Sequence, residues 1–189
     1  MLQPAKMLQE GDGLLVVDVQ NDFCPGGTLA IEGGDEVVPV LNSWIQAARE
    51  RGLPVYLSRD WHPKGHPSFS PQQGPWPVHC LQDTEGAAFH PDLMVPEGSV
   101  VVTKGVRFDQ DQLSVFDETG FSAKLRRDGV RRLWIGGLAL DVCVMESAMD
   151  ARREGFEVCL LLPACRPVTR EGGEKALDRL RRMGAEVIN

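Results

Sequence analysis

The sequence predicts an α/β fold, in which a doubly wound and mostly parallel sheet carries helices on both faces. Short apolar runs alternate along the chain with segments of helical period, which is the pattern of βαβ units. The apolar runs are continuous rather than alternating, as expected for strands that are covered on both faces. The length of 189 residues fits one domain, so we expect residues 1–189 to form a single domain.

Each element follows from a local pattern. Six strands are expected from the apolar runs, at residues 14–18, 53–58, 99–104, 132–138, 156–162 and 185–188. Helices are expected at residues 35–52, 119–127 and 142–154, and a last helix around residue 176 that closes at Gly184. Asp35 and Asp141 are the expected N-caps, because an aspartate can accept hydrogen bonds from the free N–H groups of a first turn.

Composition excludes several classes of function. The net charge of −7 argues against binding to nucleic acid or to anionic membranes, both of which need clustered Lys and Arg. The five cysteines are odd in number and contain no C-x-x-C pair, so we expect a reducing cytoplasm rather than a disulfide framework. Signal-peptide and transmembrane patterns are also missing from the sequence.

Four polar residues follow neighbouring strands at their carboxyl ends, where doubly wound sheets bind ligands. They are Asp18, Asp60, Lys104 and Cys143. Cys143 falls in the first turn of a helix, where free N–H groups and the helix dipole would lower the pKa of its thiol. An acid, a lysine and such a thiol could supply a base, an electrostatic partner and a nucleophile. A buried, unreactive cysteine beside ordinary loop charges remains the alternative.

A second cluster lies in the irregular stretch at about 59–98. Three of the four histidines, His62, His66 and His79, fall within 18 residues, close to Asp60. Prolines and glycines exclude a helix here, so a loop must present these side chains. One carboxylate and three imidazoles suit Zn²⁺, Fe²⁺ or Mn²⁺ with open positions for water. The spacing matches no standard zinc motif, so polar loop histidines without a metal remain the alternative, and Cys80 is expected to be a packed thiol.

Five motifs resemble the nicotinamidase/pyrazinamidase family, which are amidases within the isochorismatase-like cysteine hydrolases. They are V-D-V-Q-N-D-F at 17–23, R-D-W-H-P through H-P-S-F at 59–69, W-P-V-H-C at 76–80, K-G at 104–105 and G-L-A-L-D-V-C-V at 137–144. The resemblance runs from about residue 14 to the last strand. It implies the strand order 3-2-1-4-5-6 in one isochorismatase-like hydrolase domain, with a metal-binding loop inserted at about 59–98.

The resemblance also implies residue roles. Asp18 is the expected base, Lys104 its charged partner and Cys143 the nucleophile. A cis peptide is expected at Leu138–Ala139, with the backbone N–H groups of Ala139 and Cys143 forming an oxyanion hole. One divalent ion, zinc first with iron or manganese as alternatives, is expected on Asp60, His62, His66 and His79. The expected substrate contacts are Phe23 and Trp76 on the two sides of a pyridine ring, with Leu29, Leu113, Leu138 and Val142.

The function implied is hydrolysis of nicotinamide to nicotinate and ammonia through a Cys143 thioester, in NAD salvage, with pyrazinamide as a further substrate. The sequence departs from the family pattern at Leu113, Leu140, Val142 and Pro163, where Tyr, Thr, an aromatic or His, and Asp are common. Leu113 and Val142 make the pocket rim more apolar. A sister hydrolase for carbamoyl or ureido substrates and a non-enzymatic, metal-stabilised module stay open as alternatives, as does a homo-oligomer.

Overall fold

The computed structural model describes residues 2–189 and contains a six-stranded sheet in the order β3-β2-β1-β4-β5-β6. The strands are β1 (Asp12–Val17), β2 (Val55–Asp60), β3 (Val100–Lys104), β4 (Arg132–Leu138), β5 (Glu157–Arg166) and β6 (Glu186–Ile188). Every neighbouring pair is parallel. The predicted fold class and strand order are therefore confirmed.

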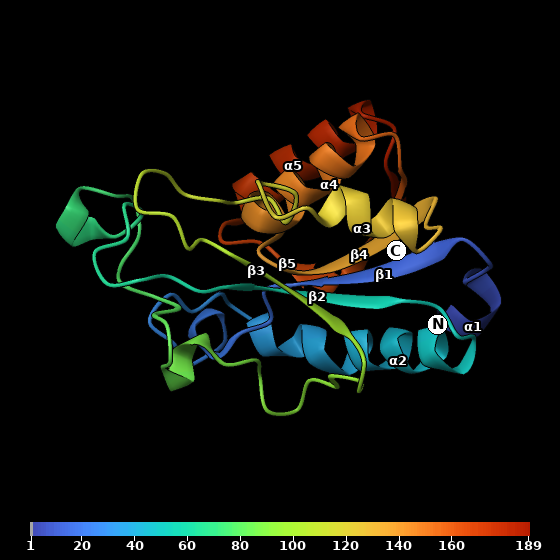
Figure 1. The fold of residues 1–189 in the computed structure, drawn as a ribbon, viewed down its shortest axis with the longest axis horizontal. Coiled ribbons are helices and arrows are strands. Elements are labelled where there is room, and N and C mark those ends of the chain that lie inside the picture. The colour runs from blue at the N-terminus through green and yellow to red at the C-terminus, as the bar shows by residue number, and fades with distance from the viewer. Residues whose placement is uncertain (1) are drawn as a thin grey trace.

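Helices cover both faces of this sheet. Figure 1 shows α2 (Val37–Glu50) on one face, and α3 (Phe121–Arg127), α4 (Met145–Arg153) and α5 (Arg170–Arg182) on the other. Each face has its own apolar core, one between α2 and the sheet and one between the sheet and α3 to α5. All six residues of β1 are buried, which explains its continuous apolar run. A short helix that the sequence pattern did not predict, α1 (Pro4–Met7), lies near the N-terminus.

Two of the predicted helix caps are wrong. Asp35 lies inside a 3₁₀ turn, η2 (Gly34–Glu36), which leads into α2, and the N-cap of α2 makes no side-chain hydrogen bond. Asp141 lies inside a π-helical turn, η5 (Leu140–Val144), which precedes α4. Its carboxylate accepts hydrogen bonds from the backbone N–H groups of Val168 and Thr169. A carboxylate near a helix start therefore found donors in a loop distant in sequence instead of capping its own turn.

Two segments depart from regular secondary structure, namely β5 and the long connection between β2 and β3. β5 is longer than predicted, and its register with β4 shifts between Ile135 and Gly137, which accommodates Pro163 as a bulge does. Residues 61–99 contain only the 3₁₀ turns η3 (Ser70–Gln72) and η4 (Glu85–Ala87) with isolated bridges, as the sequence predicted.

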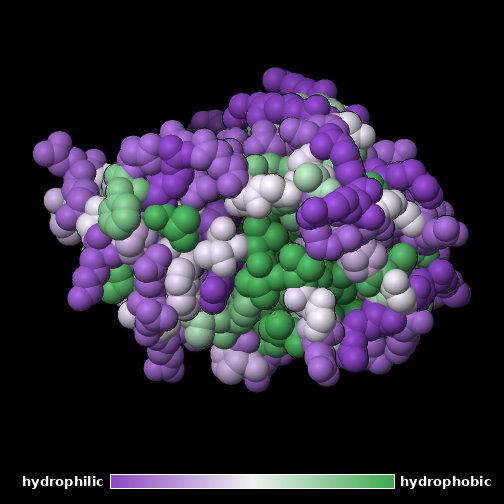
Figure 2. All heavy atoms as spheres, viewed as in Figure 1, coloured by the Kyte–Doolittle hydropathy of each residue, from purple (hydrophilic) through white to green (hydrophobic). Residues whose placement is uncertain are grey.

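The surface is largely polar. On the face viewed in Figure 2, hydrophilic residues cover the outer parts, and an apolar area lies near the centre. β3 is an edge strand, and Val101 on it is exposed. Within residues 2–189, none of the helices combines the length and the apolar character needed to cross a bilayer.

Candidate active site and metal centre

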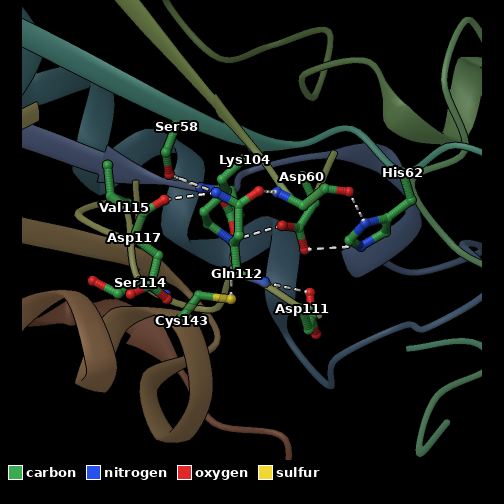
Figure 3. A network of polar contacts seen from close by, with 12 residues as sticks. Ser58, Asp60, His62, Lys104, Asp111, Gln112, Ser114, Val115, Asp117 and Cys143 are labelled. Atoms are coloured by element: carbon green, nitrogen blue, oxygen red, sulfur yellow. Dashed lines mark hydrogen bonds and ion pairs between the residues drawn. The ribbon is translucent and has the colours of Figure 1, made fainter. Parts of the chain in front are cut away.

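The four polar residues predicted at the strand ends meet at one edge of the sheet. Asp18 follows the last residue of β1, Asp60 and Lys104 are the last residues of β2 and β3, and Cys143 lies in η5 after β4. Because these four strands are neighbours and parallel, their carboxyl ends bring the side chains together (Figure 3).

The Lys104 ammonium is the centre of this cluster. Its Nζ lies 2.8 Å from Asp18 Oδ2, 2.6 Å from Asp60 Oδ1 and 3.4 Å from Cys143 Sγ. Asp18 and Lys104 are completely buried. The Ser58 hydroxyl, on β2, donates a 2.7 Å hydrogen bond to Asp18 Oδ1. Two carboxylates thus compensate one buried ammonium, which leaves the cluster with an excess of negative charge.

Burial and pairing separate the pKa values of these groups. Burial raises the pKa of Asp18, and Lys104 offsets only part of that effect. For Asp60, burial acts in the same direction, but Lys104 and His62 outweigh it, and its pKa falls below the usual range. Burial alone would lower the pKa of Lys104, but the two carboxylates raise it well above its ordinary value. Asp60 and Lys104 therefore form the ion pair, and Asp18 is the carboxylate with the higher proton affinity.

The expected lowering of the Cys143 pKa is wrong. Burial raises the pKa of this thiol well above its ordinary value, and the attraction of Lys104 does not overcome it. The physical reason is that Cys143 is buried, with 5% of its surface exposed, and its thiol faces the carboxylates of Asp18 and Asp60 as well as the ammonium. Donor atoms of Asp18, Asp60 and Cys143 all lie within 4.8 Å of one another. A proton acceptor is thus close to a thiol that is neutral at rest.

The backbone around Cys143 adopts the geometry that the resemblance implied. The peptide bond Leu138–Ala139 is cis, as predicted. Gly137 has a φ of 132°, and a Cβ there would lie 2.1 Å from the carbonyl oxygen of Val17, so only glycine fits. Ala139 and Cys143, whose backbone N–H groups were expected to form an oxyanion hole, both line the pocket beside the sheet edge.

Hydrogen bonds orient all three loop histidines, but His66 differs from the other two, because its Nδ1 also accepts a 3.3 Å hydrogen bond from the backbone N–H of Ser68. Each Nδ1 lies 2.7 Å from an oxygen, namely the Gly105 carbonyl for His62, the Pro77 carbonyl for His79 and the Ser68 hydroxyl for His66. A carbonyl only accepts, so Nδ1 carries the hydrogen in His62 and His79, and Nε2 keeps its lone pair. The Nε2 atoms of His62 and His66 are buried and have no hydrogen-bond partner. Histidines that bind metals are oriented by their second nitrogen in this way.

The metal donors form two overlapping sets rather than one. The ligand atoms of Asp60, His62 and His79 lie within 4.8 Å of one another, and so do those of His62, His66 and Asp111. His62 belongs to both sets, and the rings of His62 and His66 stack with their centroids 4.0 Å apart. Unpaired imidazole nitrogens beside carboxylates fit a divalent ion such as Zn²⁺, Fe²⁺ or Mn²⁺. Sequence reasoning missed Asp111, because a single aspartate in a loop gives no signal of its neighbours.

A pocket lies against both clusters, with Asp60, His79 and Cys143 in its lining. Its lining includes five of the predicted substrate contacts, Phe23, Leu29, Trp76, Leu113 and Val142. It also includes Ile31, Asp111 and Val168, which the sequence did not indicate. Leu138 was expected to contact the substrate, and this prediction is wrong. Its side chain is fully buried in the core that packs against α2, and it is not part of the pocket lining. A mostly apolar pocket with a few convergent polar groups suits a small, flat organic substrate.

Two buried amides hold the site together, and sequence reasoning missed both. Gln20 binds the backbone of Asp60 twice, accepting from its N–H at 2.8 Å and donating to its carbonyl at 2.7 Å. Gln112 accepts a 3.0 Å hydrogen bond from the N–H of Gly105, the residue whose carbonyl orients His62. Sequence reasoning also missed Ser58, because a single serine inside a strand gives no sign of the group to which its hydroxyl donates.

Comparisons with known proteins agree with this geometry. The isochorismatase domain family matches residues 12–189. A nicotinamidase of Escherichia coli is 38% identical over 176 residues, which cover 82% of this chain and 83% of that protein. The structure of a Pyrococcus horikoshii pyrazinamidase in complex with zinc superimposes with a TM-score of 0.92 at 39% identity, covering 95% of this chain and 99% of that one. The structure of PnC1 from L. infantum with nicotinate gives 0.87 at 34% identity, covering 94% and 92%.

The fold, the site and these relatives define the chain as an amidohydrolase built on a doubly wound sheet. It belongs to the isochorismatase domain family, as the five sequence motifs predicted.

Proposed function

We propose that this enzyme hydrolyses nicotinamide to nicotinate and ammonia through a thioester on Cys143, with pyrazinamide as a second substrate. The observation that carries the proposal is the buried contact of one ammonium, Lys104, with both Asp18 and Cys143 at the floor of an apolar pocket. The names of the relatives support the choice of substrate. We assign the reaction to a single domain, residues 1–189, with the inserted loop at about 59–98.

The first half-reaction acylates the enzyme. Asp18 takes the proton of the Cys143 thiol, and Lys104, 3.4 Å from the sulfur, stabilises the thiolate that forms. The sulfur attacks the carboxamide carbon, and the N–H groups of Ala139 and Cys143 hold the oxyanion, which contributes about 3–4 kcal/mol per donor. Asp18 then gives its proton to the amide nitrogen. The C–N bond breaks, ammonia leaves and a thioester remains.

The second half-reaction returns the enzyme to its starting state. Asp18, again a carboxylate, takes a proton from water while the water oxygen attacks the thioester carbon. The C–S bond breaks and the proton on Asp18 returns to the Cys143 sulfur. The product leaves as the carboxylic acid and releases the second proton of the water to the solvent, which gives nicotinate. The raised pKa of Asp18 suits this exchange, since the carboxyl must hold a proton twice in each turnover.

The residues that would hold a divalent ion are Asp60, His62, His66 and His79. We propose zinc first, with iron and manganese as alternatives. When bound, the ion would hold the ring nitrogen of the substrate, directly or through bound water, and so orient the substrate rather than act as a Lewis acid. The rings of Phe23 and Trp76 would enclose the pyridine ring, because both line the same pocket. The unpaired imidazole nitrogens favour this reading over a carbamoyl hydrolase, which would not need the three histidines. The enzymes among the relatives favour it over a non-enzymatic, metal-stabilised module.

The test is ammonia release from nicotinamide, pyrazinamide and a carbamoyl amide, with and without a chelator. We expect turnover of the first two and strong loss after chelation. Turnover confined to the carbamoyl amide, or none of the three, would reject the proposal. The five free, buried cysteines support placement in a reducing cytoplasm, where we propose that the enzyme serves NAD salvage.

A further inference from the structure

Asp111 lies at the histidine cluster, although it is outside the proposed ligand set. It belongs to the loop between β3 and α3, and its side chain lines the substrate pocket. Its carboxylate oxygen lies within 4.8 Å of the donor atoms of both His62 and His66. Figure 3 shows Asp111 in the same network as Asp60 and His62. The side chain is 26% exposed, so the carboxylate faces the cluster from the open side.

The distance between Asp111 and His66 fits a shared ion better than a direct contact. Asp111 Oδ1 and His66 Nε2 are 3.9 Å apart, too far for a hydrogen bond. His66 Nε2 is buried without any hydrogen-bond partner, which is costly unless another group binds it. Two atoms that each bind one ion at about 2.0–2.2 Å lie about 3–4 Å from one another. The two atoms therefore have the separation of two ligands on one cation.

The loop holds Asp111 in this position through the same residues that orient His62. The Asp111 carboxylate accepts a 2.8 Å hydrogen bond from the N–H of Gln112. The Gln112 side chain accepts from Gly105, and the Gly105 carbonyl accepts from His62 Nδ1. Gly105 has a φ of 70°, and a Cβ there would lie 2.4 Å from the His62 ring, so the loop fits closely against the imidazole. Asp111 and His62 are thus positioned together.

We propose that Asp111 is a further carboxylate ligand of the divalent ion, on the pocket side of the site. This inference rests on the metal site of the proposed function. The charges support it, because Asp60 gives one of its oxygens to Lys104 at 2.6 Å and so shares its negative charge with an ammonium. A second carboxylate supplies the further negative charge that is needed to balance a divalent cation at that site. It also shifts the donor set towards oxygen, which favours ions of higher coordination number.

The experiment measures metal binding directly. Zn²⁺ and Co²⁺ are titrated into chelator-treated wild type, Asp111→Asn and Asp109→Asn, with affinity measured by competition against a chromophoric chelator. We expect Asp111→Asn to weaken Zn²⁺ binding by at least about 10-fold and to change the visible absorption of bound Co²⁺. Asp109 is the matched control, since its exposed carboxylate pairs with Arg107 in the same loop. Asp109→Asn should behave as wild type.

Each other outcome is decisive. Wild-type affinity and an unchanged Co²⁺ spectrum in Asp111→Asn would overturn the inference. Reduced turnover with unchanged metal affinity would overturn it too, and would assign Asp111 to the substrate. Equal thermal midpoints of the metal-free proteins exclude a folding defect. Ammonia release by the wild type is measured separately: an enzyme that turns over nicotinamide while binding no ion refutes the inference and the metal site on which it rests, but not the proposed hydrolysis, whereas Asp111-dependent binding without turnover refutes the proposed hydrolysis alone.

Discussion

The two halves of the site are built differently. The cluster of Asp18, Lys104 and Cys143 stands at the ends of neighbouring strands, so the topology of the sheet fixes its geometry. The histidine cluster lies on a loop with only 3₁₀ turns, and its side chains are oriented by hydrogen bonds between their ring nitrogens and nearby backbone or hydroxyl groups. The first half is pre-organised by the fold, whereas the second half has two buried nitrogen atoms without hydrogen-bond partners, to which a divalent ion would bind.

Asp60 joins the two halves. Its Oδ1 accepts from Lys104 at 2.6 Å, and its Oδ2 lies 3.5 Å from His62 Nε2. One carboxylate thus belongs to the ion pair of the strand ends and to the donor set of the loop. The comparison predicts that changes in the strand-end cluster abolish chemistry, while changes in the histidine loop weaken substrate binding first.

The largest effect is expected for Cys143→Ala, which removes the sulfur that forms the thioester. Ammonia release should fall by about 10⁴-fold or more, since loss of a nucleophile removes the whole covalent route. Cys165→Ala is the matched control, because Cys165 is equally buried in β5 but does not line the pocket. Near wild-type turnover by Cys143→Ala would disprove a covalent mechanism.

The second largest effect is expected for Lys104→Met, which leaves two buried carboxylates without a counter-charge. Removing one partner of a buried ion pair costs about 3–5 kcal/mol of unfolding free energy, and activity should be lost as well. The pKa of Asp18 is already raised by burial, so the folded variant favours its protonated form. The loss should therefore be smallest at acid pH and grow as the pH rises.

Urea unfolding at several pH values measures this effect. Lys175→Met is the control, because Lys175 pairs with Glu171 on the surface, where such a bridge contributes at most about 1 kcal/mol. If both lysine variants lost the same stability, the central role of the buried ammonium would be refuted.

Metal removal should affect the two halves unequally. We expect chelation to raise KM for nicotinamide by about 10- to 100-fold while kcat falls less, because orientation is lost before chemistry. Added Zn²⁺ should restore KM, and at 100 times its Kd should add about 2.7 kcal/mol to the unfolding free energy. A fall in kcat at unchanged KM would show that the ion takes part in the chemistry.

The difference between the strand-end cluster and the histidine loop also determines how much of the site could be predicted from the sequence. Buried parallel strands are continuous apolar runs, so their ends, and with them Asp18, Lys104 and Cys143, could be located from the pattern. The sequence pattern could not show from which N–H groups a carboxylate accepts its hydrogen bonds. Asp141 binds the N–H groups of Val168 and Thr169, a choice that depends on packing rather than on local sequence.

Burial is the other quantity that local sequence conceals. The position of Cys143 in the first turn of a helix predicted a lowered pKa for its thiol, but burial beside two carboxylates raises that pKa. Leu138 was expected in the pocket, although its side chain is in the core and its neighbour Ala139 lines the site. Asp111 and Ser58 have roles only because distant segments lie against them, and these roles became visible in the structure alone.

The smallest effect concerns Ser58, and it tests whether the strand-end cluster is tuned as well as positioned. The Ser58 hydroxyl donates to Asp18 at 2.7 Å and so lowers the pKa of a carboxyl that burial has raised. Ser58→Ala should raise that pKa further, and the acid limb of the kcat/KM profile should move to higher pH. Turnover should fall by about fivefold on that limb, the factor for one hydrogen bond of about 1 kcal/mol, and remain unchanged at alkaline pH.

Ser122→Ala is the control, since Ser122 donates to Glu154 on the surface of α3, away from the pocket. A shift of the acid limb in Ser58→Ala but not in Ser122→Ala would identify Asp18 as the group whose ionisation limits the rate. A uniform loss at every pH would mean instead that Ser58 only holds Asp18 in place. In that case a side-chain hydrogen bond would position Asp18 as well, and the two halves of the site would differ less than their construction indicates.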